Sequence, residues 1–262
     1  MRTPDDRIGS IYSLMLRGFY STAFQPIVDT GSGQAIGYES LLRGPEDTPL
    51  ADPNRLFNEA GYLPESVRLK LDRACIDSAV RTGRNLPNDA LLFINILGST
   101  LIQLTSLLGE FIALLGMLRI APGRIVFEVS ETTSCAMTED LVRCIRCLQQ
   151  AGIRVALDDI GVRSPYLYHL LCLEPEFLKM DRIFVHDIDR NPRKQLLVDS
   201  MARMAERMGA RLIAEGIETA DEFSTIKALS VPMSQGYYLG RPRPAGQWLA
   251  AGCAGSGMRA VG

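Results

Sequence analysis

The stretch Arg154-Val155-Ala156-Leu157-Asp158-Asp159 is a short apolar run that ends abruptly on two adjacent carboxylates. Gly152 and Gly161 bound the run, and this pattern is typical of a strand buried on both faces, as in a parallel sheet. Two aspartates at the end of such a strand repel each other and resist desolvation, so they need a cation or a proton beside them. A structural role is the alternative, because Asp next to Gly also starts turns and caps helices.

The length and composition narrow the class of protein. The 262 residues fit two ordinary domains or one (β/α)8 barrel, which typically has about 250 residues. Hydrophobic residues make up 47% of the chain and charged residues 22%, as in globular proteins. The formal net charge is −2, with 28 Lys and Arg against 30 Asp and Glu. This balance argues against binding to duplex nucleic acid, while a local basic pocket for a small anion remains compatible with it.

The sequence carries no sign of export or of a membrane anchor. No apolar run reaches the roughly 18 residues of a membrane span, and the first six residues have no apolar segment like that of a signal peptide. The six cysteines form no paired framework, so we expect reduced thiols. These features predict a cytoplasmic protein without a membrane span.

Strand and helix patterns alternate along the chain. A turn at 29–33 joins strands at 23–28 and 35–42 into an antiparallel hairpin. Further strands are predicted at 90–95, 124–128, 153–158, 176–180, 211–215 and 233–238. Helices are predicted at 8–17, 55–60, 65–82, 99–118, 138–150, 165–172, 192–208 and 219–229. Eight strands in this order favour an α/β fold of the closed (β/α)8 barrel type, with an open doubly wound sheet as the alternative.

Polar residues terminate the apolar runs. In a barrel these ends converge on one face, where the active site belongs. Several oxygen-bearing side chains at one mouth repel each other unless divalent cations neutralise them, and carboxylate and amide oxygens suit Mg²⁺, Mn²⁺ or Ca²⁺. The two histidines of the chain lie outside this pattern. The residues concerned are Glu39, Asn95, Glu128, Asp158, Asp159, Lys179 and Glu215.

So many carboxylates indicate a two-metal site for phosphoryl transfer, in which paired cations hold the attacking and the leaving oxygen. Lys179 fits as a cation that holds or deprotonates the water, because positive charge nearby would lower its pKa. The alternatives for Lys179 are a plain salt bridge with Asp181, which lies on the same side of an alternating strand, or a surface lysine without a role in the site.

Seven motifs in order resemble the EAL domain family of cyclic di-GMP phosphodiesterases and their inactive relatives. The motifs are Phe24-Gln25-Pro26-Ile27-Val28, Tyr38-Glu39-Ser40-Leu41-Leu42-Arg43, Phe127-Glu128-Val129-Ser130-Glu131, Ala156-Leu157-Asp158-Asp159, Leu178-Lys179-Met180-Asp181, Ala214-Glu215-Gly216-Ile217-Glu218-Thr219 and Ser234-Gln235-Gly236-Tyr237-Tyr238. The resemblance implies a modified TIM barrel with its first strand antiparallel. It predicts a single domain over residues 1–262, with a core at about 8–247 and a tail at about 248–262.

The resemblance also implies roles for individual residues and for ligands. It implies hydrolysis of cyclic di-GMP to linear pGpG with Mg²⁺ or Mn²⁺, and a homodimer. Ca²⁺ is expected to be an inhibitory ion, because its larger and looser coordination shell positions the water less strictly. Lys179 and Glu215 match the family's water-activating positions, and Glu131 and Glu218 match loop-stabilising ones. The positions that match metal ligands are Glu39, Asn95, Glu128, Asp158 and Asp159, and those that match substrate contacts are Gln25, Arg43 and Gln235.

One loop departs from the family pattern. After the two aspartates the family usually has a second glycine and two serines, whereas residues 160–166 read Ile-Gly-Val-Arg-Ser-Pro-Tyr. Arg163 in place of glycine and Pro165 stiffen the loop, so we expect nucleotide binding with modest turnover. Two other functions stay open: a catalytically silent cyclic di-GMP receptor that acts through a protein partner, and a protein-binding module that uses the barrel as a scaffold.

Overall fold

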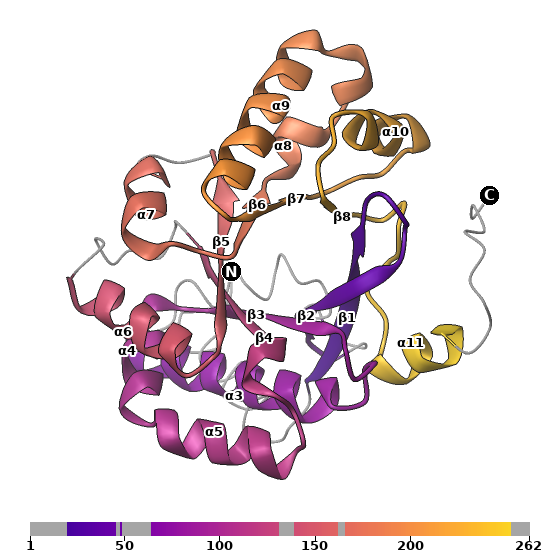
Figure 1. Ribbon diagram of the computed structural model, residues 1–262. Helices are drawn as coiled ribbons and strands as arrows, with labels where there is room; N and C mark the ends of the chain where they lie inside the picture. The colour runs from indigo at the N-terminus through magenta and orange to yellow at the C-terminus, as the bar shows by residue number, and fades with distance from the viewer. Residues whose placement is uncertain (1–19, 46–47, 49–63, 131–138, 162–165, 253–262) are drawn as a thin grey trace, which may run out of the picture.

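The computed structural model describes residues 20–45, 48, 64–130, 139–161 and 166–252. Eight strands form a closed barrel in which neighbours in sequence are neighbours in space (Figure 1). The strands are β1 (Ser21–Asp29), β2 (Ala35–Arg43), β3 (Leu91–Ile96), β4 (Ile125–Ser130), β5 (Arg154–Ile160), β6 (Phe177–Met180), β7 (Arg211–Ala214) and β8 (Met233–Gln235). The predicted barrel is confirmed and the open-sheet alternative is wrong.

The first strand runs against the rest of the barrel. β1 pairs antiparallel with β2 on one side and with β8 on the other, whereas every pair from β2 to β8 is parallel. The reason is local, because the short turn after Asp29 can only return the chain as an antiparallel hairpin. Gly33 lies in this turn with a φ of 72°. All seven parallel strands therefore direct their carboxyl ends to the same mouth.

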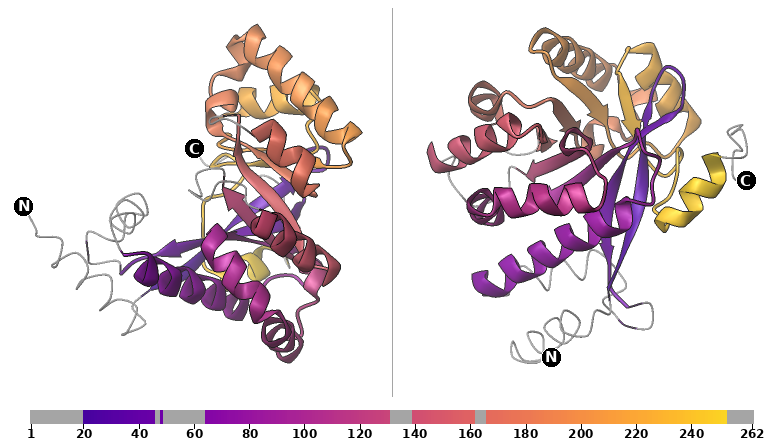
Figure 2. Two further views of the ribbon diagram at one scale, coloured as in Figure 1. Left: turned by 90° about the vertical axis from the view of Figure 1, so that its left-hand side faces the viewer. Right: turned by 60° about the horizontal axis from the view of Figure 1, so that its bottom comes forward.

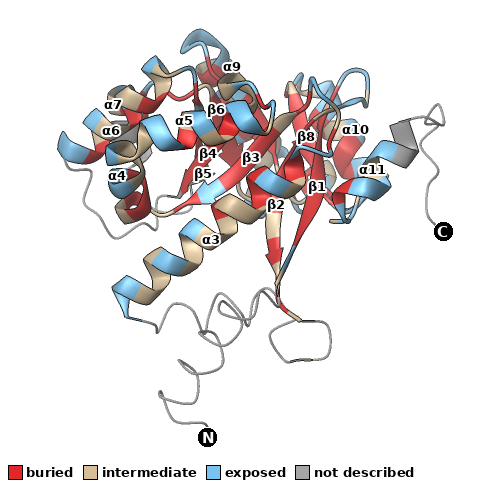
Figure 3. Cartoon of the chain, turned by 90° about the horizontal axis from the view of Figure 1, so that it is seen from below, coloured by how far each residue is buried: buried red, intermediate tan, exposed pale blue. Residues whose placement is uncertain are grey.

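Helices form the outer layer, and their exposed faces point away from the strands (Figures 2 and 3). Each parallel strand is followed by a helical connection, as a parallel sheet requires. The helices are α3 (Glu65–Gly83), α4 (Gly98–Ser106), α5 (Leu108–Met117), α6 (Glu139–Gln150), α7 (Tyr166–Leu173), α8 (Arg182–Val185), α9 (Pro192–Arg207), α10 (Ala220–Ala228) and α11 (Ala245–Gly252), with short 3-10 turns at Pro122–Arg124 and Ile188–Arg190.

An apolar layer fills the barrel interior. Its members come from alternate positions of the strands and are at most 1% exposed: Ile27, Phe93, Val126, Ala156, Phe177, Ile213 and Met233. The rings of Phe93 and Phe177 meet edge to face with their centroids 5.2 Å apart. Burial of each large side chain contributes roughly 1.5–3 kcal/mol to the stability of the folded state. This apolar layer therefore forms a rigid floor under the carboxyl ends of the strands.

Gly37 is the residue of β2 that lies in the same layer. A Cβ atom at Gly37 would lie 2.9 Å from the Phe93 ring and 3.1 Å from the carbonyl oxygen of Leu91. No ordinary side chain fits there, because the ring of Phe93 already occupies the space. The glycine thus allows β2 and β3 to close the barrel around a large aromatic residue.

The helix predicted at 99–118 is wrong as one continuous element. It breaks at Leu107 into α4 and α5, which are bent by 84°. Leu101 before the break and Leu115 after it are both fully buried and belong to the same apolar core. The hydroxyls of Thr105 and Ser106 bond backbone carbonyls at the break and weaken the helix there. Within the described residues, no single helix has the length and hydropathy needed to cross a membrane.

Helix α11 covers the flank of the barrel where the hairpin leaves no crossover helix (Figure 1). The indole Nε1 of Trp248 donates a hydrogen bond of 2.8 Å to the carbonyl oxygen of Phe24, and its ring lies 5.6 Å from that of Tyr38. The sequence patterns missed this helix and α8. The domain limits stay a prediction, and the helices predicted at 8–17 and 55–60 lie outside the described residues.

Candidate active site at the barrel mouth

The candidate residues form a polar layer directly above the apolar floor. Side chains of a strand alternate between its two faces, so a residue two positions beyond an interior residue also points inward. Gln25 lies two positions before Ile27 on the reversed strand β1, and Glu39 lies two positions after Gly37. Asn95, Glu128, Asp158, Lys179, Glu215 and Gln235 each follow a residue of the floor by two positions.

Lys179 is the centre of this polar layer. Its side chain is 1% exposed, and its Nζ atom lies 2.8 Å from both Glu128 Oε1 and Glu215 Oε1. The same atom lies 3.5 Å from Asp158 Oδ1 and 3.6 Å from Glu39 Oε2. Asp181 instead accepts a hydrogen bond of 2.7 Å from the backbone N–H of Ile183 at the start of α8. The alternative of a plain Lys179–Asp181 salt bridge is therefore wrong.

The charges in the polar layer are unbalanced. Five carboxylates, those of Glu39, Glu128, Asp158, Asp159 and Glu215, surround one lysine. Burial by itself lowers the pKa of Lys179, but the surrounding carboxylates raise this pKa well above its usual value. Burial also raises the pKa values of Glu128 and Glu215 well above normal, despite the opposing effect of Lys179. The lowered pKa predicted for Lys179 therefore requires positive charge beyond that of the protein itself.

Amide side chains hold the carboxylate of Glu39. Asn95 Nδ2 donates to Glu39 Oε1 at 3.1 Å, and Gln235 Nε2 donates to Glu39 Oε2 at 2.7 Å. Gln235 Nε2 also reaches Gln25 Oε1 at 3.3 Å, while Gln25 Nε2 donates to the carbonyl oxygen of Gly240 at 3.1 Å. The amides of Gln25 and Gln235, which the resemblance assigned to the substrate, thus also position Glu39. This orientation of a carboxylate by neighbouring donors is what a metal ligand needs.

An irregularity in β5 brings both aspartates to the mouth. The register with β6 shifts between Leu157 and Ile160, and Asp159 adopts a left-handed conformation with a φ of 57°. The backbone N–H of Asp159 donates a hydrogen bond of 2.9 Å to Asp158 Oδ1. A regular strand would send the two side chains to opposite faces, so the bulge is what lets both carboxylates serve one site. The sequence prediction of a regular strand missed this feature.

The donor set fits a divalent cation that prefers oxygen ligands. Ligand atoms of Asp158, Asp159 and Glu215 lie within 4.8 Å of one another. Glu128 Oε2 is buried and makes no hydrogen bond with any residue that the structure describes. A buried carboxylate oxygen without a partner is costly unless a cation binds it. Glu215 belongs to this geometric group, although the resemblance gave it a water-activating role and not a ligand role.

A pocket of about 270 Å³ opens above the polar layer. Its lining residues are Gln25, Glu39, Asp181, Arg182, Glu215, Gly216, Glu218, Gln235, Gly236 and Tyr237. Arg182 and Glu218 form an ion pair of 2.9 Å on its wall. Arg43, a predicted substrate contact, is absent from the lining, and its Nη1 atom donates to the carbonyl oxygen of Leu42 at 2.9 Å. Burial lowers the pKa of Arg43.

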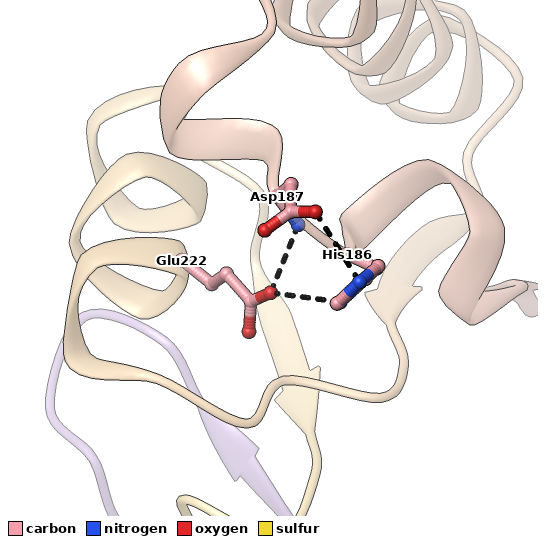
Figure 4. Close-up of side chains that lie close together, drawn as sticks. All are labelled: His186, Asp187 and Glu222. Atoms are coloured by element: carbon pink, nitrogen blue, oxygen red, sulfur yellow. Dashed lines mark hydrogen bonds and ion pairs between the residues drawn. The ribbon is translucent and has the colours of Figure 1, made fainter.

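Glu222, which Figure 4 shows beside His186 and Asp187, is the residue that braces the loop between β7 and α10. Its Oε2 atom accepts hydrogen bonds from the backbone N–H groups of Glu218 and Thr219 at 2.8 and 3.1 Å. Its Oε1 atom accepts from the backbone N–H of Asp187 at 3.0 Å, and His186 Nδ1 lies 3.6 Å away. The sequence interpretation gave the loop-stabilising role to Glu218 and missed Glu222. The capping-box pattern Thr219-x-x-Glu222 is the signal that could have found it.

We expect Glu222→Gln to lower the free energy of unfolding by about 1–3 kcal/mol at neutral pH, because one of the two accepting oxygens becomes an N–H donor. Burial raises the pKa of Glu222, but the backbone donors Glu218, Asp187 and Thr219 lower it more, so its pKa lies below the usual value of a glutamate. The stabilisation is therefore present above the unfolded-state pKa and is lost as the pH falls through the folded-state value. Urea unfolding at neutral and acidic pH measures this difference.

The matched control for this substitution is Glu206→Gln on the exposed side of α9, which should leave the free energy of unfolding nearly unchanged. If the difference in the free energy of unfolding between Glu222→Gln and wild type stays constant from neutral to acidic pH, the ionised-carboxylate interpretation is contradicted.

Two predicted features fall outside the part of the chain that the structure describes. Glu131, a predicted loop-stabilising residue, lies there, as do residues 162–165 of the divergent loop. Of residues 160–166, the structure describes Ile160, Gly161 and the helical start at Tyr166. The expected effect of Arg163 and Pro165 on turnover stays a prediction.

The fold and the site define the class of protein: a (β/α)8 barrel whose strand ends carry an acidic, lysine-centred site. Residues 13–242 match the model of the EAL domain family, and the chain belongs to this family. A probable cyclic di-GMP phosphodiesterase of Escherichia coli K12, PdeA, is 30% identical over 151 residues, which are 58% of this chain and 21% of the relative. The cyclic di-GMP phosphodiesterase NbdA of Pseudomonas aeruginosa is 26% identical over 84% of this chain and 28% of its own length. The chain thus spans less than a third of either relative.

Solved structures share the fold. The manganese and cyclic di-GMP complex of BlrP1 from Klebsiella pneumoniae is 26% identical, with a TM-score of 0.76 over 86% of this chain and 56% of that one. The cyclic di-GMP complex of the PaMucR phosphodiesterase has a TM-score of 0.81 over 92% of this chain and 99% of that one. Its identity is 23%, so this likeness concerns the fold alone.

Proposed function

We propose that this chain hydrolyses cyclic di-GMP to linear pGpG with Mg²⁺ or Mn²⁺. The observation that carries the proposal is the fully buried Lys179, which holds Glu39, Glu128, Asp158 and Glu215 together at the barrel mouth. The relatives named as cyclic di-GMP phosphodiesterases support the choice of substrate. The manganese in the BlrP1 complex supports the choice of ion.

The residues divide the chemistry between them. The residues that would hold the ions are Glu39, Asn95, Glu128, Asp158 and Asp159. The close oxygen atoms of Asp158, Asp159 and Glu215 are compatible with this role. Bound Mg²⁺ or Mn²⁺ would supply Lewis acidity and lower the pKa of water. Glu215 Oε1 accepts the proton of the attacking water, and Lys179 Nζ, 2.8 Å from it, orients that water by donating a hydrogen bond. The water oxygen bonds to phosphorus as one P–O3′ bond breaks, and the freed 3′ oxygen takes up a proton.

The pocket provides the groups that orient the nucleotide. Gln25 and Gln235 line it with amide groups, and Arg43 lies close enough to Tyr237 and Glu39 for their charges to affect its pKa. We assign substrate contacts to Gln25, Arg43 and Gln235. Glu218 stabilises the pocket wall through its ion pair with Arg182. The planar guanidinium of Arg43 suits a phosphate oxygen pair.

Metal dependence is the direct test. Incubation of the protein with cyclic di-GMP and either Mg²⁺ or Mn²⁺ is expected to yield pGpG, and an excess of chelator is expected to stop the reaction. Ca²⁺ should bind but support little turnover, because its larger and looser coordination shell positions the water less strictly. Chromatographic separation of the dinucleotide from the cyclic substrate measures all three outcomes.

The same assay separates the proposal from its alternatives. Formation of pGpG in excess chelator would contradict the two-metal mechanism. Tight cyclic di-GMP binding in calorimetry without turnover would identify a receptor, and no binding at all would favour a scaffold that acts on a protein partner. The predicted homodimer is checked separately by light scattering on the eluting protein.

A further inference from the structure

The turn that carries Asp158 and Asp159 is held in a conformation that the chain does not favour by itself. Asp159 has a φ of 57° and Gly161 a φ of 91°, and the pairing of β5 with β6 is interrupted between Leu157 and Ile160. A left-handed residue other than glycine costs on the order of 1 kcal/mol or more and persists where its surroundings enforce it. Some contact must therefore hold the turn in place.

Phe184 of α8 makes that contact. A Cβ atom built on Gly161 would lie 2.8 Å from Phe184 Cζ and 2.9 Å from Phe184 Cε2, so the ring rests directly against the Gly161 backbone. Phe184 is partly buried and packs against the main apolar core. The ring thus fills the space that any side chain at 161 would need, and it supports the backbone two residues beyond Asp159.

Helix α8 is itself fixed in position. Asp181 caps its first turn by accepting the backbone N–H of Ile183 at 2.7 Å, and the backbone N–H of Phe184 donates to the carbonyl oxygen of Asp181 at 3.1 Å. Arg182 is tied to Glu218 across the pocket wall by an ion pair of 2.9 Å. Val185, which follows Phe184, is fully buried. The ring of Phe184 is therefore presented to Gly161 from an anchored support.

We propose that Phe184 is the positioning residue for the Asp158–Asp159 turn, and that its contact with Gly161 sets the cation affinity of the two aspartates. This inference rests on the proposed function, because it requires the aspartates to bind Mg²⁺ or Mn²⁺. Phe184 does not line the pocket and is not assigned a contact with the substrate or the attacking water. It acts by fixing the orientation of the Asp158 and Asp159 carboxylates, as residues that pack against metal ligands do.

Calorimetric titration with Mn²⁺ in the absence of nucleotide tests the inference on the full chain. We expect Phe184→Ala to lower Mn²⁺ affinity about 10- to 100-fold, the range found when groups that support a metal ligand are removed. Phe184→Leu, which keeps part of the contact, should lose less. At saturating Mn²⁺ the kcat of both variants should recover most of the wild-type value, because the aspartates are then held by the bound ions.

A second pair of substitutions tests the contact itself. Gly161→Ala should weaken Mn²⁺ binding, since its methyl group would meet the ring at 2.8 Å and its φ of 91° is unfavourable for alanine. Combining it with Phe184→Leu should weaken binding less than the product of the two single effects, because the smaller side chain makes room for the methyl group. Strictly multiplicative effects would show that the two residues act independently and would overturn the inference.

The control is Phe111→Ala on α5, which removes a ring that is more deeply buried than that of Phe184 and packs on Phe127 outside the barrel. It should change thermal stability without changing Mn²⁺ affinity. Wild-type Mn²⁺ affinity in a folded Phe184→Ala protein would overturn the inference while leaving the proposed function intact.

Hydrogen exchange of residues 157–161 without metal gives an independent measure: faster exchange in Phe184→Ala supports the inference, and unchanged exchange contradicts it. A wild-type protein that binds no Mn²⁺ would overturn the proposed function instead.

Discussion

Lys179→Met is expected to lower kcat for cyclic di-GMP hydrolysis by about 1,000-fold, in the range seen when a donor or a proton-transfer group is removed from an active site. The affinity for cyclic di-GMP should change only a few-fold, because Lys179 is 1% exposed and lies below the pocket. Such a split identifies an interaction used mainly in the transition state. Steady-state kinetics combined with calorimetric binding in Ca²⁺ measures both quantities.

The same substitution should have a second effect on stability that depends on metal. In chelator, Lys179→Met should lower the free energy of unfolding by about 3 kcal/mol, because Glu128 and Glu215 lose the cation 2.8 Å away. Added Mn²⁺ should restore most of this loss, since bound cations neutralise the same carboxylates. Urea unfolding with and without Mn²⁺ makes the comparison.

The control for Lys179→Met is Lys227→Met, which replaces an exposed lysine on α10 whose Nζ atom bonds the carbonyl oxygen of Gly31. It should alter kcat by less than a factor of two and the free energy of unfolding by less than about 1 kcal/mol. A Lys179→Met protein with wild-type kcat would remove Lys179 from the mechanism and leave it a structural ion pair.

Glu39→Gln is expected to remove metal binding and activity together, which distinguishes it from Lys179→Met. The substitution keeps the size of the side chain but removes the negative charge that Asn95 and Gln235 hold in place. We expect Mn²⁺ affinity to fall at least about 10-fold and kcat at subsaturating Mn²⁺ at least about 100-fold. Titration calorimetry with Mn²⁺ and initial rates over a range of Mn²⁺ concentrations give the two values.

Glu110→Gln, at an exposed position of α5, is the matched control for Glu39→Gln and should match wild type in both measurements. Lys179 Nζ and Glu39 Oε2 are 3.6 Å apart, so the effects of the two substitutions on kcat are not expected to be independent. The double variant should lose less kcat than the product of the two single losses. Unchanged Mn²⁺ affinity in Glu39→Gln would exclude Glu39 as a ligand and would assign its carboxylate to the positioning of Gln235 and Asn95.

The sequence by itself determined the alternation of strands and helices and the strand positions that carry the site, whereas the closure of the sheet was shown by the structure. Apolar runs that alternate with helical segments predict parallel strands, and the turn after Asp29 predicts the antiparallel start. Because side chains alternate along a strand, a charged residue two positions after an interior residue must point to the same interior. Glu128 after Val126 and Lys179 after Phe177 follow this rule, and the structure brings them to 2.8 Å. Side-chain alternation and the succession of elements along the chain are local properties, so they can be predicted from the sequence alone.

The tertiary structure decided the features that depend on contacts between distant segments. The break at Leu107 bends α4 from α5 by 84°, and residues of both helices then pack in the same apolar core. The bulge that brings Asp159 beside Asp158 depends on the register with β6, and its support comes from Phe184, 23 residues further along the chain than Gly161. Glu222 acts as a brace because three backbone N–H groups from two loops converge on its carboxylate. These geometries arise from packing across the closed sheet, and packing is fixed only when all eight strands are in place.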